Sequence, residues 1–257
     1  MSSTLGQYCI NVTDLESSVA FFEGLGIPCD SRTEIEQAFE AIIAHPSHGS
    51  RLQLAQQRQT PWSRGNALWK IYINTRDIAA TFARAVELGA RVESEPEQLD
   101  RWPVTVGFVR GPDDMLIEFV ERHPWPDTDP LDAPWLGQYC VNVSDLDATI
   151  AFYELLGLTC TSRTEIPQAF EAIIEDATTG RKLQLAQQKD QDAPIDLGMV
   201  WKLYVYTDDC AALYRTAVDA GFPSVMEPTP LDRWPVTVAF VADPDGYQIE
   251  LVERHQS

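Results

Sequence analysis

The chain repeats itself, and this duplication constrains its fold more than any other feature of its 257 residues. Residues 5–12 (LGQYCINV) return as residues 136–143 (LGQYCVNV), and residues 37–43 (QAFEAII) return unchanged as residues 168–174. Both pairs are related by a shift of 131 positions, which becomes 132 after one inserted residue. A repeat of this length and fidelity predicts two halves with the same fold.

Each half contains a second, fainter repeat. Residues 7–15 (QYCINVTDL) align with residues 70–78 (KIYINTRDI). In each quarter an alternating strand pattern ends at an Asp that suits a helix N-cap, and a helical segment follows that ends at a Gly. Three further strands are predicted after the helix, in the first quarter at about Arg32–Ile35, Ala38–Ala44 and Arg51–Gln56. The sequence therefore predicts four consecutive βαβββ modules.

Short motifs give these modules a resemblance to a known family. The pattern V-T-D-L, F-F and L-G occupies residues 12–26, its counterpart V-S-D-L, F-Y and L-G occupies 143–157, and residues 243–251 read DPDGYQIEL. The chain resembles the vicinal oxygen chelate superfamily, which includes glyoxalase I, bleomycin-resistance proteins and extradiol dioxygenases. The resemblance implies an α+β fold in which four βαβββ modules form two cupped mixed sheets. It implies little about activity, because this fold hosts many functions.

The duplication also predicts the domain organisation. We expect a first domain of two modules at residues 1–123, a linker at 124–135, and a second domain of two modules at 136–257. The linker region has four prolines and no hydrophobic periodicity. It is long enough to let one chain complete both cups, so we expect a monomer with pseudo-twofold symmetry, with a homodimer as the alternative.

The resemblance also implies which residues line the cups, because the family takes its metal ligands from the first and last strand of each module. Carried over residue by residue, these positions give each cup two glutamines, one lysine and one glutamate. The eight residues are Gln7, Gln53, Lys70, Glu118, Gln138, Gln184, Lys202 and Glu250. Strand alternation adds side chains two or four positions away on the same face, and the ligand-binding candidates among them are Asn11, Tyr72, Asn142 and Tyr204.

The lysines are the chemically important departure from the family. A metal ligand must offer a lone pair, and deprotonating an ordinary lysine at pH 7 costs about 5 kcal/mol. We therefore predict that Lys70 and Lys202 occupy the metal position as ammonium groups, each paired with Glu118 or Glu250, and that no metal or other cofactor is bound. The alternative is a divalent metal held by Gln and Glu. A site of three histidines is not expected, since the chain has only four histidines, in turns and at domain ends.

The motif D-R-W-P, present in both halves, supplies a second set of candidates. Arg101 with Trp102, and Arg233 with Trp234, precede the penultimate strand of each half. An arginine beside a flat aromatic ring suits an anionic or planar ligand, and we expect these residues to contribute to ligand binding. A structural Asp–Arg pair that closes a turn is the alternative.

Composition limits the partners. The chain has 19 Lys and Arg against 39 Asp and Glu, and a formal charge of −20 repels nucleic acid. No apolar run approaches the length of a membrane span, so we expect no membrane partner. The first six residues have neither a basic nor an apolar segment of the kind found in signal peptides, which favours a cytoplasmic protein.

These observations lead to a functional hypothesis with two alternatives. We expect a metal-free small-molecule site that either sequesters its ligand or supports a mild isomerase or lyase step, with Lys70, Lys202, Glu118 and Glu250 as catalytic acids and bases. One alternative is a metal-dependent glyoxalase, lyase or dioxygenase. The other is a non-catalytic scaffold, in which the polar cluster only fills a disused cavity.

Overall fold

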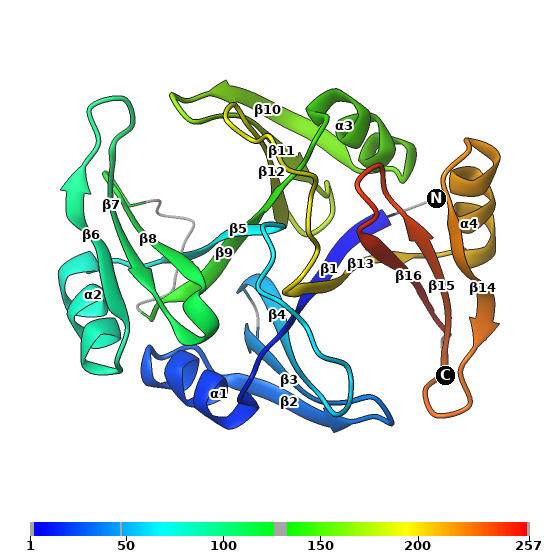
Figure 1. Ribbon diagram of the computed structural model, residues 1–257, viewed down its shortest axis with the longest axis horizontal. Coiled ribbons are helices and arrows are strands. Elements are labelled where there is room, and N and C mark those ends of the chain that lie inside the picture. Colours follow the sequence, from blue (N-terminus) through cyan, green and yellow to red (C-terminus); the bar gives the residue numbers. More distant parts are fainter. Residues whose placement is uncertain (1–2, 47, 126–132, 256–257) are drawn as a thin grey trace. The chain divides into compact units, whose positions relative to one another are not determined.

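The computed structural model describes residues 3–46, 48–125 and 133–255 (Figure 1). Most of the predicted linker, residues 126–132, lies outside these described residues. Within them the chain forms four βαβββ modules in succession, which confirms the α+β fold predicted from the sequence.

The modules have closely similar boundaries. The first contains β1 (Ser3–Asn11), α1 (Leu15–Gly24), β2 (Cys29–Glu34), β3 (Ala38–His45) and β4 (His48–Gln57). The second contains β5 (Leu68–Asn74), α2 (Ile78–Glu87), β6 (Arg91–Gln98), β7 (Val104–Arg110), the 3₁₀ turn η1 (Pro112–Asp114) and β8 (Leu116–Arg122). The third contains β9 (Trp135–Asn142), α3 (Leu146–Leu155), β10 (Thr159–Glu165), β11 (Ala169–Glu175) and β12 (Lys182–Gln188). The fourth contains β13 (Val200–Thr207), α4 (Cys210–Asp219), β14 (Ser224–Pro230), β15 (Val236–Ala242) and β16 (Gln248–Arg254). Strand β4 begins at His48, three residues before the predicted start at Arg51.

The predicted aspartate caps start all four α-helices. Asp14 accepts a hydrogen bond from the backbone N–H of Ser17, and the other three caps, Asp77, Asp145 and Asp209, each accept one from the residue three positions on. A glycine follows each helix at positive φ, for example Gly26 at 88°. Glycine adopts this conformation without strain, so the chain can turn there toward the next strand.

Each helix packs on the strands of its own module (Figure 1). Helix α1 buries Val19, Phe21 and Phe22, and α3 buries Ile150, Phe152 and Tyr153 at the equivalent positions. Tyr8, Phe119, Tyr139 and Tyr247 are among the largest fully buried side chains, so aromatic residues contribute much of the apolar area removed from water.

The strands form two mixed sheets of eight. One has the order β14-β15-β16-β13-β1-β4-β3-β2, and the other has the order β10-β11-β12-β9-β5-β8-β7-β6. The last three strands of each module are antiparallel neighbours, whereas β5 pairs with β8 in parallel and β13 pairs with β16 in parallel. These two parallel pairs bring Lys70 beside Glu118 and Lys202 beside Glu250.

Two compact units divide the chain. The N-terminal unit comprises residues 10–64 and 69–139, and the C-terminal unit comprises residues up to 9, residues 65–68, and residues from 140 onward. Strands β1 and β9 have residues in both units. In the described parts of both units, no helix has the length and apolar character needed to cross a membrane.

Candidate functional site

In the N-terminal unit, strand register brings Lys70 and Glu118 together. Tyr72 on β5 pairs with Glu118 on β8, and Phe108 on β7 pairs with Glu118 from the other side. Lys70 lies two residues before Tyr72 and therefore projects from the same face of β5. Its Nζ lies 2.9 Å from Glu118 Oε2. The side chains of both residues are about nine-tenths buried.

Aromatic rings surround the Lys70 ammonium. Its Nζ lies 4.4 Å from the ring centre of Trp69, 5.0 Å from that of Tyr72 and 5.9 Å from that of Phe108. Each ring offers the negative face of its π system to the cation, so both the ion pair and the rings favour the charged form of the lysine. We call Lys70, Glu118 and these three rings the Lys70 cluster.

The C-terminal unit contains a matching arrangement. Tyr204 on β13 and Phe240 on β15 both pair with Glu250 on β16, and Lys202 Nζ lies 2.8 Å from Glu250 Oε2. The same nitrogen lies 4.7 Å from the ring centre of Trp201, 5.0 Å from that of Tyr204 and 5.8 Å from that of Phe240. These residues form the Lys202 cluster. Each lysine thus pairs with the glutamate of its own half, which is one of the two pairings expected from the sequence.

One carboxylate oxygen of each cluster has no contact beyond the ion pair among the described residues. Apart from the ion pairs, Glu118 Oε2 and Glu250 Oε2 receive no hydrogen bond from the described residues. Each cluster therefore presents a cation and a carboxylate, side by side and mostly shielded from water, where a polar contact is stronger than at the surface.

The four predicted glutamines have different environments. Gln7 is buried on β1 in the C-terminal unit, where its Oε1 accepts a hydrogen bond of 2.7 Å from the Tyr206 hydroxyl. Gln138 is half-buried on β9 in the N-terminal unit. Gln53 on β4 and Gln184 on β12 are both buried, at positions paired with Ile42 and Ile173.

Two predicted asparagines tie strand ends together. Asn11 Oδ1 accepts a hydrogen bond from Gln57 Nε2, and Asn142 Oδ1 accepts one from Gln188 Nε2, each at 2.8 Å. Asn142 also donates to the Asn66 carbonyl. Each asparagine fastens the end of β1 or β9 to the adjacent long strand of its module.

The D-R-W-P residues lie in exposed turns. Arg101 stacks on Trp102 with 4.6 Å from the guanidinium carbon to the ring centre, and Arg233 stacks on Trp234 at 4.7 Å. Both tryptophans are 39% exposed. The turns hold both residue types at the surface, where they remain candidates for contact with a ligand.

Three kinds of residue near the lysines were not predicted. They are the tryptophan before each lysine (Trp69 and Trp201), the phenylalanine of the penultimate strand (Phe108 and Phe240), and Tyr206. The repeat of W-K in both halves was a usable signal for the tryptophans. The phenylalanines depend on the register between neighbouring strands, which the repeat pattern does not reveal.

The side chains of the Lys70 and Lys202 clusters are poor ligands for the divalent metal that the family resemblance implies. Each lysine is paired with the only carboxylate of its cluster, and an ammonium has no lone pair for a metal. Within the described residues, no group of three or more His, Cys, Asp or Glu side chains is arranged to hold a metal ion.

Comparisons with known proteins relate the chain to lactoylglutathione lyases. It is 24% identical over 210 residues to a lactoylglutathione lyase of Arabidopsis thaliana, a match that covers 74% of this chain and 68% of that protein. It is also 24% identical over 175 residues to a lactoylglutathione lyase of Oryza sativa subsp. japonica, covering 64% of this chain. The chain spans 57% of the length of the rice relative.

A solved structure and a family model also match the chain. The crystal structure of glyoxalase I from Zea mays superposes with a TM-score of 0.84 at 19% identity, over 98% of this chain and 92% of that one. The model of the Glyoxalase/Bleomycin resistance protein/Dioxygenase superfamily matches residues 4–119 and 135–251. The chain therefore belongs to the Glyoxalase/Bleomycin resistance protein/Dioxygenase superfamily.

Proposed function

We propose that each lysine–glutamate cluster is the polar end of a site for a small oxygen-bearing molecule, and that the lysine ammonium there replaces the metal of the family. The observation that carries the proposal is the buried pair itself, at 2.9 Å in one half and 2.8 Å in the other, with the same three rings around it. Removing two charged groups from water is costly, and apolar residues of similar size fill such a space more cheaply.

The geometry favours a ligand with a carbonyl or enolate oxygen. Lys70 Nζ can donate a hydrogen bond to such an oxygen, as a metal ion would polarise it. Glu118 can accept a proton from the adjacent carbon, and its Oε2 has lone pairs available for that role. The relatives named lactoylglutathione lyases support a 2-hydroxy carbonyl compound as the ligand class.

Binding and catalysis are separated by one experiment. The protein is incubated in D₂O with lactoylglutathione or hydroxyacetone, and exchange of the α-proton is followed by NMR while binding is followed by thermal shift. We expect both compounds to raise the melting temperature. If the protein is an acid–base catalyst, the α-proton of the bound compound will also exchange, and this exchange will disappear in the double variant Glu118→Gln/Glu250→Gln. If the protein only sequesters its ligand, the melting temperature will rise without exchange.

Lysine variants provide the control. The double variant Lys70→Met/Lys202→Met lacks the ammonium donors. The concentration of either compound needed for a given rise in melting temperature should therefore increase at least about tenfold. If neither compound stabilises the wild-type protein and no exchange occurs, the proposal is wrong and the clusters are structural.

A further inference from the structure

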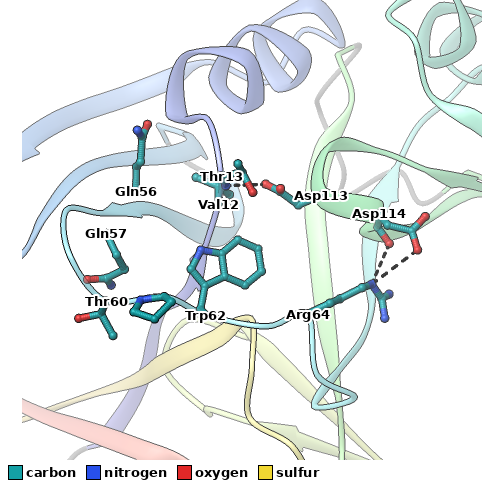
Figure 2. A pocket seen from close by; sticks show the side chains of 10 residues that line it. Val12, Thr13, Gln56, Gln57, Thr60, Trp62, Arg64, Asp113 and Asp114 are labelled. Atoms are coloured by element: carbon teal, nitrogen blue, oxygen red, sulfur yellow. Dashed lines mark hydrogen bonds and ion pairs between the residues drawn. The ribbon is translucent and has the colours of Figure 1, made fainter.

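A cavity away from both lysine–glutamate clusters lies in the N-terminal unit (Figure 2). It has a volume of about 600 Å³, within the range of small-molecule sites. It is formed by the end of β1, the end of β4, the segment that follows β4, and the turn η1. The lining residues are Val12, Thr13, Gln56, Gln57, Thr60, Pro61, Trp62, Arg64, Asp113 and Asp114. None of them belongs to the lysine–glutamate clusters.

Two hydrogen bonds between neighbouring segments form the frame of the cavity. Asp113 Oδ2 accepts a hydrogen bond from the Thr13 backbone N–H at 2.9 Å, which ties η1 to the start of α1. Gln56 Oε1 accepts one from the Leu15 backbone N–H at 2.9 Å. The C-terminal unit has the same frame, since Asp245 accepts from the Ser144 backbone N–H and Gln187 accepts from that of Leu146.

The residues added to this frame differ between the two halves. Trp62 and Arg64 lie in the segment after β4, whereas the corresponding segment after β12, residues 189–199, contains neither tryptophan nor arginine. Asp114 aligns with Gly246 at the same turn. The C-terminal unit therefore forms the same frame without a tryptophan or an arginine in this segment.

Three arginines contact Asp114 at the edge of this cavity, and one of them, Arg64, lines it. Asp114 Oδ1 accepts a hydrogen bond of 2.9 Å from Arg91, and Asp114 Oδ2 lies 3.7 Å from Arg64 Nε and 3.9 Å from Arg110 Nη1. Asp114 thus contacts three guanidinium groups, and one of these, that of Arg110, pairs more closely with Glu93, at 3.1 Å. The residues aligned with Arg91 and Arg110 in the other half are Pro223 and Ala242.

The unused hydrogen-bonding capacity of the cavity consists mainly of donors. Arg64 makes its contacts through Nε, and no hydrogen bond joins its Nη atoms to any other described residue. The Trp62 indole N–H and the Gln56 side-chain N–H groups also have no acceptor within the described residues. Figure 2 shows the Trp62 ring between Arg64 on one side and Gln57 on the other. Gln57 Oε1 and Asp113 Oδ1 remain as acceptors.

We propose that this cavity binds a small aromatic carboxylate that carries a hydroxyl group on its ring. The carboxylate pairs with the two Nη atoms of Arg64, whose planar fork matches it. The ring packs on the half-buried Trp62 indole. The ring hydroxyl donates to Asp113 Oδ1 or Gln57 Oε1. A cationic ligand is disfavoured because both aspartates already receive donors from the protein.

The test follows the Trp62 indole signal during a titration. The ¹⁵N-labelled full-length protein is titrated with 4-hydroxybenzoate, and the Trp62 indole N–H is identified by its absence in Trp62→Phe. We expect a saturable shift of that signal, at least about tenfold weaker binding in Arg64→Gln, and no saturation with benzylamine. Arg58→Gln, an exposed arginine six positions earlier in the same segment that pairs with Glu34, should bind like the wild type.

Several results would overturn the proposal. They are an unmoved Trp62 signal, equal binding by wild type and Arg64→Gln, or tighter binding of benzylamine than of 4-hydroxybenzoate. Arg64 is part-exposed, so its variant should fold, and an unchanged spectrum outside the cavity verifies this.

Discussion

The Lys70 and Lys202 clusters have the same core but different surroundings. The lysine–glutamate distance and the three rings agree to within a few tenths of an ångström. Two positions beyond Tyr204, however, Tyr206 donates to Gln7 Oε1, and Arg254 Nη2 donates to the Tyr206 hydroxyl at 3.3 Å. The residue aligned with Tyr206 in the other half is Asn74. The two halves thus differ beside the pair while the pair itself is the same. This is what we expect if the pair is the functional element of the proposed sites and its neighbours adapt each site to its ligand.

The largest expected effect comes from breaking one pair. Lys70→Met leaves the Glu118 carboxylate buried without its partner, so the free energy of unfolding should fall by about 3 kcal/mol. The double variant Lys70→Met/Glu118→Leu should recover most of that loss, because it removes both charges. Chemical denaturation measures both quantities.

The same cycle on Lys202 and Glu250 sharpens the comparison. Because the two cores match, the coupling energies of the two pairs should agree within about 1 kcal/mol. A coupling energy near zero in one half only would show that the two lysine–glutamate pairs are not equivalent.

A smaller effect concerns a carboxyl group present in one half only. Asp243 is buried, and burial raises its pKa to about 7, whereas Gly111 occupies the aligned position. Below about pH 4 the group is neutral in both the folded and unfolded states. Between pH 4 and 7 the unfolded chain loses the proton that the folded chain keeps, so stability falls as pH rises through this window.

Replacing this carboxyl group should remove that pH dependence. Asp243→Asn keeps an oxygen that can accept from the backbone N–H groups of Asp245 and Tyr247. Its melting temperature should exceed that of the wild type by several degrees more at pH 8 than at pH 5. The exposed Asp190→Asn is the control and should show equal differences at both values. A pH-independent offset in Asp243→Asn would contradict the raised pKa.

The hydrogen bond beside the Lys202 cluster can be tested by removing the Tyr206 hydroxyl group. Tyr206→Phe deletes the donor to Gln7 and should lower the free energy of unfolding by about 1 kcal/mol. It also releases the Gln7 amide oxygen for a ligand, so affinity at the Lys202 cluster should change while affinity at the Lys70 cluster stays constant. Equal changes at both clusters would argue against distinct sites.

The smallest effects are expected at the exposed turns. Trp102→Ala and Trp234→Ala remove rings that are 39% exposed, and each should change the free energy of unfolding by less than about 0.5 kcal/mol. If the rings contact a ligand, calorimetric titration will show weaker binding without a loss of stability. Unchanged binding in both variants would make these turns structural.

The repeat pattern predicted much of this structure because helix starts, helix ends and strand patterns depend on residues close together in the sequence. The aspartate caps at Asp14 and Asp145 and the glycines at Gly26 and Gly157 follow directly from residue type and position. That Lys70 pairs with a glutamate followed from the family's strand arrangement combined with the cost of burying an unpaired charge, whereas the choice of Glu118 over Glu250 did not.

Other features depend on contacts that the pattern does not contain. Phe108 faces Glu118 only because of the register between β7 and β8. The cavity beside Trp62 and Arg64 depends on the path of a segment without regular structure and on a turn in which Asp113 and Asp114 adopt positive φ. Such a turn is uncommon for residues other than glycine and is set by the surrounding contacts.

The central claim is that an ammonium group occupies the metal position, and metal analysis tests it most directly. The protein is purified without chelator and its content of zinc, nickel, iron, manganese and cobalt is measured by mass spectrometry. The account predicts less than about 0.1 metal ion per chain, since the lysines must first lose their protons to bind one. One or two ions per chain, lost together in Glu118→Gln/Glu250→Gln, would contradict it.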